Sequence, residues 1–240
     1  MENFSYWESK FQPCQYSNKL LNLINELNKA ANVPVDIFEV KKACHVAKEY
    51  HGSQLRKSGE PYYSHPLEVA YLFAKYVSEN AKQFYTTDLI ITAILHDTIE
   101  DTKLTSDMIA VIFNRSIAIG VGDLTRLKQE IKTTAADTLN SLFVQYKFDI
   151  LHIKIFDRLH NMRTIYAMKP EKQKKIIDET VSHFIPMASY LELYEIKQEF
   201  IRLCTNEVKP PQDSLEHRLY PPFPSVFPNL QNEIKRIRIQ

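Results

Sequence analysis

Four ionisable residues follow one another within the segment LHDTIEDT, residues 95–102. His96, Asp97, Glu100 and Asp101 come directly after the apolar run LIITAIL, which has the composition of a buried helix. If that helix continues, residues three and four apart share one face, so these side chains lie within about one turn of one another. Carboxylates that close raise one another's pKa and are costly to bury without partners. A bound cation removes both difficulties, so the spacing indicates a metal centre.

Two further residues are candidates to complete this centre, because neighbours on one segment cannot fill a coordination sphere. His65 begins the helix after a Gly/Pro-containing loop, and Asp157 lies among the apolar residues Ile155, Phe156 and Leu159. Taken alone, His65 is better explained as a helix-start or core histidine, and Asp157 could pair with Arg158. Two imidazoles and two carboxylates without sulfur would suit Mn²⁺, Fe²⁺ or Zn²⁺ and would activate water near neutral pH. Glu100 and Asp101 could then orient or deprotonate that water, or protonate a leaving oxygen.

A cationic loop, LRKSGEPYY, precedes His65 in the sequence. Arg56 and Lys57 form a local positive patch, and an arginine can both fork onto a phosphate and stack on a base. Ser58 and Tyr62 add hydroxyl groups. By itself this segment would be interpreted as a solvated charged loop. Because it runs straight into His65, we interpret it as the anion-binding part of the same site.

Amphipathic helices must position these residues. The chain has only four glycines, strand-like alternation is scarce, and apolar residues recur at spacings of three and four almost throughout. The sequence therefore predicts an all-α fold. The expected helices span residues 18–30, 37–51 with Asp36 as N-cap, 67–77, 86–102, 105–113 with a cap at Thr105 or Ser106, 135–148, 149–165, 171–184 and, after a break at Pro186, 187–204.

Three regions are predicted along the 240 residues. Residues 1–35 form an N-terminal helical extension, residues 36–205 form the domain that holds the candidate metal centre, and residues 206–240 form a Pro-rich C-terminal tail. Six of the twelve prolines lie between Pro210 and Pro228, which blocks helix continuation there. The texture of the sequence therefore changes at about residue 206.

Composition excludes several classes of function. The formal net charge is +1, so no bulk attraction to nucleic acid or to a membrane is expected. The three cysteines show no CxxC or Cys/His spacing of a zinc or disulfide framework. The residues near Met1 do not resemble the charged and apolar regions of a leader peptide, and no apolar run approaches the roughly 18 residues of a membrane span. We therefore expect a cytoplasmic protein without nucleic-acid or membrane partners.

Three motifs together are similar to one known family. HGSQLRKSGEPYYSHPLEVA, LHDTIEDT and IKIFDRLHNMRT resemble, in the same order, the HD-type hydrolase domain of the RelA/SpoT homologues. Those enzymes turn over the alarmones ppGpp and pppGpp of the stringent response. The resemblance runs from about Val40 to about Pro210, and it implies a compact multi-helix HD-domain bundle. It therefore implies that residues 36–205 form an HD-type metal-dependent hydrolase domain.

The resemblance also implies a role for each matching residue. It implies one Mn²⁺ per site, with Fe²⁺ or Zn²⁺ as alternatives, and the implied ligands are His65, His96, Asp97 and Asp157. The implied catalytic acids are Glu100 and Asp101. The implied contacts of the guanine nucleotide alarmone are Arg56, Lys57, Ser58, Tyr62, Asn161 and Thr164. The implied reaction removes the 3′-pyrophosphate and gives GDP or GTP plus pyrophosphate.

The segment after the metal motifs looks like the one that links hydrolase to synthetase in long bifunctional relatives, and no synthetase motif follows it. The sequence therefore predicts a hydrolase without a synthetase domain, with a separately encoded synthetase chain as a candidate partner.

Two alternatives to this function stay open. One is an HD phosphohydrolase that acts on another nucleotide, and the other is a non-catalytic module that senses the alarmone or binds a partner.

Overall fold

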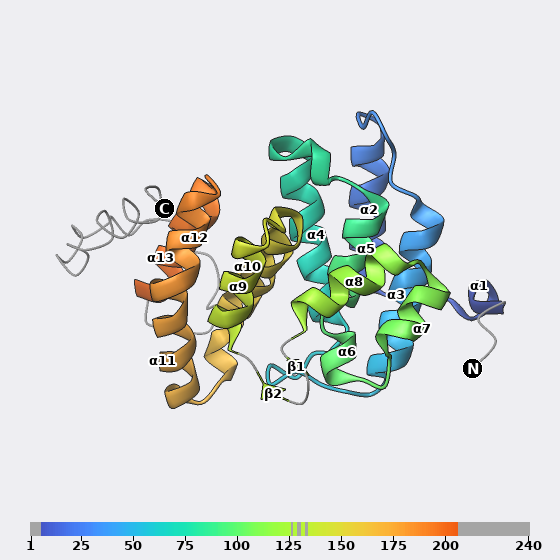
Figure 1. Cartoon of the computed structure of the whole chain (residues 1–240). Helices are drawn as coiled ribbons and strands as arrows, with labels where there is room; N and C mark the ends of the chain where they lie inside the picture. The colour runs from blue at the N-terminus through green and yellow to red at the C-terminus, as the bar shows by residue number, and fades with distance from the viewer. Residues whose placement is uncertain (1–5, 126, 129–130, 133, 206–240) are drawn as a thin grey trace, which may run out of the picture. The chain divides into compact units, whose positions relative to one another are not determined.

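A computed structural model describes residues 6–125, 127–128, 131–132 and 134–205 of the chain (Figure 1). The predicted all-α fold is confirmed, because the described residues form helices joined by loops. The strands among them are two residues long, β1 (Leu127–Lys128) and β2 (Ile131–Lys132), and they pair antiparallel. The predicted Pro-rich tail, residues 206–240, lies outside the described residues. The predicted boundary at residue 35 stays a prediction.

The chain divides into two compact units, Met1–His160 and Asn161–Gln240, and each is described by itself. The helices of the first unit are α1 (Trp7–Lys10), α2 (Gln15–Asn28), α3 (Ile37–His51), α4 (Ser64–Asn80), the 3₁₀ turn η2 (Lys82–Phe84), α5 (Thr87–Leu95), α6 (Thr98–Asp101), α7 (Ser106–Ile112), α8 (Arg115–Leu124), α9 (Ala135–Val144) and α10 (Phe148–Arg163), whose last turn belongs to the second unit. The second unit continues with the 3₁₀ turn η3 (Ile165–Ala167), α11 (Pro170–Glu179), the π-helical segment η4 (Thr180–Phe184), α12 (Ile185–Tyr190) and α13 (Tyr194–Thr205). None of the described helices is long and apolar enough to cross a bilayer.

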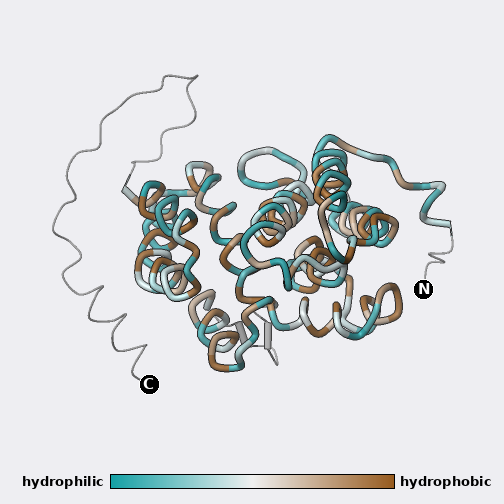
Figure 2. Tube along the Cα trace, turned by 90° about the horizontal axis from the view of Figure 1, so that it is seen from above, coloured by the Kyte–Doolittle hydropathy of each residue, from teal (hydrophilic) through white to brown (hydrophobic). Residues whose placement is uncertain are grey.

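Helix α5 is the central helix of the first unit. It packs against α3, α4 and α8 (Figure 1), and every residue from Ile90 to Leu95 is buried. A helix that is apolar on all sides is expected to be enclosed by others, which explains its sequence TDLIITAIL. The surrounding helices alternate hydrophobic and hydrophilic residues within each turn, as Figure 2 shows, and are amphipathic. The end of α5 is therefore held in a fixed place by the core.

Polar caps set several helix starts where the sequence predicted them. The Asp36 side chain accepts hydrogen bonds from the backbone N–H groups of Phe38 and Glu39 at the start of α3. The Thr105 side chain accepts one from the N–H of Met108 at the start of α7. Side-chain oxygens at these positions satisfy N–H groups that the first turn of a helix leaves without partners.

The single helix that we predicted over residues 86–102 is wrong. Helix α5 ends at Leu95, and α6 starts at Thr98 after His96 and Asp97. The hydroxyl of Thr98 donates to the carbonyl of Leu95 at 2.7 Å, and Nδ1 of His96 donates to the carbonyl of Ala93 at 2.9 Å. These side chains satisfy carbonyls at the end of α5, where the next turn of helix would otherwise do so. His96 and Asp97 therefore lie at a junction between two helices.

The break that we predicted at Pro186 is also wrong. The chain stays helical from α11 through the π-helical segment η4 into α12, and Pro186 lies in the first turn of α12. Proline has no N–H to donate, and its ring crowds the carbonyl four residues earlier in a regular helix. The wider π-helical turn before Pro186 leaves room for the ring. The helix instead ends at Tyr190, and Glu192 takes a positive φ of 60° before α13 begins.

Gly120 of α8 lies where the helix closely approaches its neighbours. A Cβ at this position would lie 3.0 Å from Cγ2 of Thr92 and 3.1 Å from Cδ1 of Ile150. We expect Gly120→Ala to lower the free energy of unfolding by about 1–2 kcal/mol, because extra volume in a packed core forces side chains out of place. Urea unfolding measures this change.

Gly122, on the same helix, supplies the matched control. A Cβ there has no neighbour within 4 Å, so Gly122→Ala should stabilise the helix by about 0.5–1 kcal/mol. Equal effects of the two substitutions would show that the close approach at Gly120 has no energetic consequence.

Candidate metal centre

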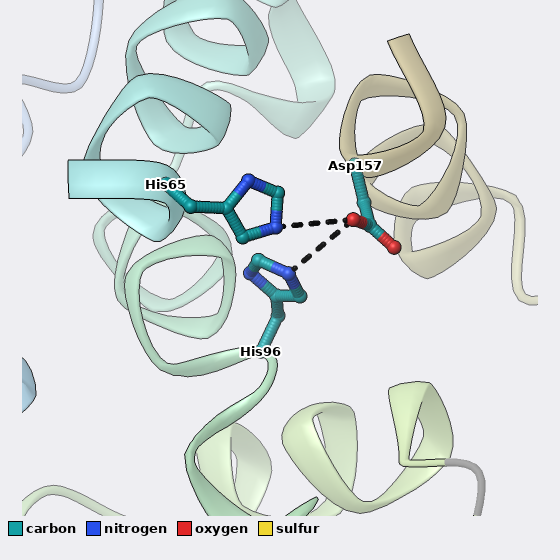
Figure 3. A group of neighbouring side chains, drawn as sticks. All are labelled: His65, His96 and Asp157. Atoms are coloured by element: carbon teal, nitrogen blue, oxygen red, sulfur yellow. Dashed lines mark ion pairs between the residues drawn. The ribbon is translucent and has the colours of Figure 1, made fainter. Parts of the chain in front are cut away.

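Three predicted ligands from separate helices meet at one point. His65 lies in the first turn of α4, His96 directly follows α5, and Asp157 lies on α10. One ligand atom from each lies within 4.8 Å of the others. Figure 3 shows both imidazole rings pointing toward the Asp157 carboxylate, with Nε2 of His65 3.2 Å and Nε2 of His96 3.7 Å from its Oδ1. This arrangement has the donor types and spacing of a metal site.

The other ring nitrogen of each histidine has a hydrogen-bond partner within the protein. Nδ1 of His96 donates to the carbonyl of Ala93, and Nδ1 of His65 lies 2.8 Å from Nδ1 of His160. Metal-binding histidines are commonly held in this way, with one nitrogen fixed by a neighbour and the other presented to the ion. In both rings it is therefore Nε2 that faces Asp157.

Asp97 lies outside this group of three, but its environment fits a ligand. Its Oδ1 lies 3.2 Å from Nε2 of His51, while its Oδ2 is buried without a hydrogen-bond partner. Among the described residues, the other buried side-chain oxygens of this kind are the hydroxyls of Ser58 and Ser64, close in sequence to His65. A buried carboxylate oxygen without a partner is costly. A cation would remove that cost, so the residues present fit a divalent metal ion.

The charges of the centre suit a cation. Burial alone would raise the carboxylate pKa values, but His96 lowers the pKa of Asp97 to about 2, and Lys154 and the two histidines hold the pKa of Asp157 well below its ordinary value. Burial lowers the pKa of His65. Burial acts in the same direction on His96, but the two carboxylates outweigh it and raise the pKa of His96 to about 8. Binding of a metal near neutral pH therefore has to displace a proton from His96.

Lys154, one turn before Asp157 on α10, supplies a buried positive charge. Its Nζ lies 3.0 Å from Oδ2 of Asp157, and its side chain is 7% exposed. Arg158, and not Lys154, was the ion-pair partner that the sequence suggested for Asp157. Because Lys154 holds Oδ2, the other oxygen of Asp157 is the one that faces the two imidazoles.

The two predicted catalytic acids lie on the short helix α6. Glu100 is half-buried and Asp101 is exposed. The hydroxyl of Tyr62 donates to Oδ2 of Asp101 at 2.6 Å. The pKa of Asp101 is raised, chiefly because neighbouring protein displaces part of its hydration, and the negative charges of Asp97 and Glu100 add to this effect. Asp101 is thus a carboxyl group at the surface whose proton affinity is higher than usual.

The cationic loop closes on itself as a tight turn. A bridge pairs Leu55 with Pro61, the N–H of Arg56 donates to the carbonyl of Glu60 at 2.8 Å, and Gly59 takes a φ of 91° that favours glycine. Arg56 and Ser58 are half-buried and Lys57 is exposed. The hydroxyl of Ser58 is buried and has no hydrogen-bond partner.

Asn161 and Thr164, the other predicted nucleotide contacts, belong to the second unit. Asn161 lies in the last turn of α10, and the Thr164 hydroxyl donates to its carbonyl at 3.4 Å. Both residues are half-buried. Their contact with a nucleotide stays a prediction.

Sequence reasoning missed four residues around the centre: His51, Gln54, Lys154 and His160. A signal existed for two of them, because Lys154 and His160 lie three residues before and after Asp157 and so share its face of α10. For His51 and Gln54 no spacing rule applied, since their partners Asp97 and Asp101 are distant in the sequence.

The sequence is similar to one domain family and to several known proteins. The profile of the HD domain family matches residues 43–193. The chain is 36% identical over 177 residues to the GTP pyrophosphokinase rsh of Brucella ovis. The aligned residues make up 71% of this chain and 23% of that protein. It is 35% identical over 183 residues to the guanosine-3′,5′-bis(diphosphate) 3′-pyrophosphohydrolase of Aquifex aeolicus, and the aligned residues make up 75% of this chain and 25% of that protein. It is 34% identical over 190 residues to the bifunctional (p)ppGpp synthase/hydrolase SpoT of Escherichia coli, and the aligned residues make up 77% of this chain and 26% of that protein. The chain thus spans about a quarter of the length of the relatives it matches.

Proposed function

The chain belongs to the HD domain family and is related to the RelA/SpoT enzymes, and from this we propose that it hydrolyses the 3′-pyrophosphate of ppGpp and pppGpp in a metal-dependent reaction. The observation that carries the proposal is the convergence of His65, His96 and Asp157, together with the partnerless Oδ2 of Asp97. The name of the Aquifex aeolicus relative states the same reaction for that protein.

In this proposal His65, His96, Asp97 and Asp157 hold one Mn²⁺ ion, with Fe²⁺ or Zn²⁺ as alternatives. When bound, such an ion acts as a Lewis acid on a phosphate oxygen and makes water more acidic. The fit is supported by carboxylates that stay ionised at neutral pH and by imidazoles whose Nδ1 atoms are already engaged. A site of nitrogen and oxygen donors without sulfur favours these ions over softer ones.

Asp101 and Glu100 would move protons in this reaction. Water adds to the phosphorus that is bonded to the 3′-oxygen and gives up a proton, while the departing 3′-oxygen gains one. A carboxyl group with a raised pKa is suited to this exchange, because it holds a proton closer to neutral pH than an ordinary aspartate. Tyr62 keeps Asp101 oriented through its 2.6 Å hydrogen bond.

The cationic loop would bind the nucleotide. Arg56 and Lys57 supply positive charge for phosphates, the planar guanidinium can also stack on the guanine, and Ser58 and Tyr62 supply hydroxyls. The partnerless Ser58 hydroxyl supports this role. Asn161 and Thr164 are proposed as further contacts, and a separately encoded synthetase is proposed as a partner.

A direct assay tests the proposal. Purified protein with Mn²⁺ and ppGpp labelled in the 3′-pyrophosphate should release labelled pyrophosphate and leave GDP. EDTA should abolish release and added Mn²⁺ should restore it, because the four ligands act only through the ion. Tight ppGpp binding without release would instead favour a sensing module. Faster hydrolysis of another nucleotide would favour a different HD phosphohydrolase.

A further inference from the structure

His51 is a buried histidine with a partner on each side of its ring. It is the last residue of α3, and it is 1% exposed. Nδ1 lies 3.0 Å from Oε1 of Gln54, and Nε2 lies 3.2 Å from Oδ1 of Asp97. The ring also stacks on Tyr62, with centroids 4.8 Å apart and an interplanar angle of 24°. Both ring nitrogens and one face of the His51 ring therefore have a partner within the protein.

The partners of His51 are connected to one another and to the predicted acid. Nε2 of Gln54 donates to the backbone carbonyl of Asp101 at 2.9 Å, and the hydroxyl of Tyr62 donates to its carboxylate at 2.6 Å. The N–H of Tyr62 donates to the carbonyl of Gln54 at 2.9 Å. The network therefore joins the end of α3, the cationic loop and both ends of α6.

The direction of these hydrogen bonds follows from Gln54. Because its amide N–H₂ donates to the carbonyl of Asp101, its oxygen is the atom that faces His51, and it can only accept. The carboxylate of Asp97 likewise accepts, so both ring nitrogens of His51 are donors, as in the protonated ring. The His51 ring thus occupies Oδ1 of Asp97, and this sets the rotation of the carboxylate that leaves Oδ2 without a protein partner.

We propose that His51 is a positioning residue that orients Asp97 toward the metal ion and, through Gln54 and Tyr62, holds Asp101 in place. The inference rests on the proposed function. A purely structural role, in which His51 only packs α3 against the loop, would leave metal affinity unchanged once the protein is folded.

Two substitutions separate the contacts of the ring. In His51→Gln the side-chain amide nitrogen can take the place of Nε2 and still donate to Asp97. In His51→Asn the amide nitrogen takes the place of Nδ1, so the contact with Gln54 is kept and the one with Asp97 is lost. His45→Asn is the matched control, because His45 is also buried on α3 but lies against Trp7, with ring centroids 6.1 Å apart.

Mn²⁺ binding, followed by the electron paramagnetic resonance signal of the free ion, is the main readout. We expect His51→Asn to weaken Mn²⁺ binding about 10- to 100-fold, as loss of a residue that orients a ligand commonly does. At saturating Mn²⁺ its kcat for pyrophosphate release should fall more than its KM changes. His51→Gln should restore most of the affinity, and His45→Asn should keep it at the wild-type value. Thermal unfolding in EDTA reports the fold of each variant.

Each outcome bears on a separate statement. Equal Mn²⁺ affinity of wild type and His51→Asn would overturn the positioning role, as would an equal loss in His45→Asn. Mn²⁺ binding by wild type without pyrophosphate release would overturn the proposed function while the affinity comparison still decides the role of His51. A wild type that binds no Mn²⁺ would overturn both.

Discussion

Asp157→Asn is expected to lower the rate of pyrophosphate release on the order of a thousandfold or more, because the centre loses its ion and the Lewis acid with it. Oδ1 of Asp157 faces both imidazoles at 3.2 and 3.7 Å, so the substitution removes the central negative charge while keeping the shape. Mn²⁺ binding should become undetectable at the concentrations that saturate wild type. Release rate and Mn²⁺ affinity are measured on the same preparation.

The same substitution leaves Lys154 as a buried cation without its carboxylate. Removing one partner of a buried ion pair lowers the free energy of unfolding by about 3–5 kcal/mol, so unfolding of the variant would also reduce the measured rate. The double variant Lys154→Met/Asp157→Asn removes both charges and should recover stability in thermal unfolding without recovering Mn²⁺ binding. Asp149→Asn, on the same helix but outside the centre, should keep both properties. Recovery of turnover in the double variant would contradict the role of Asp157 as a ligand.

Asp101→Asn is expected to lower kcat about 10²- to 10⁴-fold, the range typical for loss of a general acid or base. The amide can still accept the hydrogen bond from Tyr62, so the local structure should persist. Mn²⁺ affinity should stay at the wild-type value, because Asp101 is outside the group of proposed ligands. Any limb of the pH profile of kcat/KM that arises from Asp101 should disappear in the variant.

Asp107→Asn provides the control for Asp101. Asp107 is another exposed aspartate, in the first turn of α7, and its replacement should leave kcat unchanged. A wild-type rate in Asp101→Asn would remove Asp101 from the mechanism and leave Glu100 as the remaining candidate. A parallel loss of Mn²⁺ binding would show instead that Asp101 supports the metal centre.

The sequence predicted the parts of this protein that depend on local pattern. Apolar spacing located the helices. Asp157 was recognised because it lies among apolar residues, His96 and Asp97 because they follow an apolar run, and His65 because it lies at a helix start. The end of α5 escaped prediction, because helical periodicity continues through Thr98–Asp101 and only the hydrogen bonds of His96 and Thr98 reveal the break. The contact between His51 and Asp97 escaped for another reason. It joins distant parts of the chain, and a single sequence carries no record of such pairs.

The break between α5 and α6 places the proposed metal ligand His96 and the proposed acids Glu100 and Asp101 on separate helical segments. His96 is anchored by the enclosed helix α5, whereas Glu100 and Asp101 stand on a helix of four residues tied by Tyr62 and Gln54 to the loop. Replacing that single turn would discard the acids and spare the imidazoles. In the proposed hydrolase, such a change would therefore remove turnover and keep the imidazoles and the cationic loop that are proposed to bind the ion and the nucleotide.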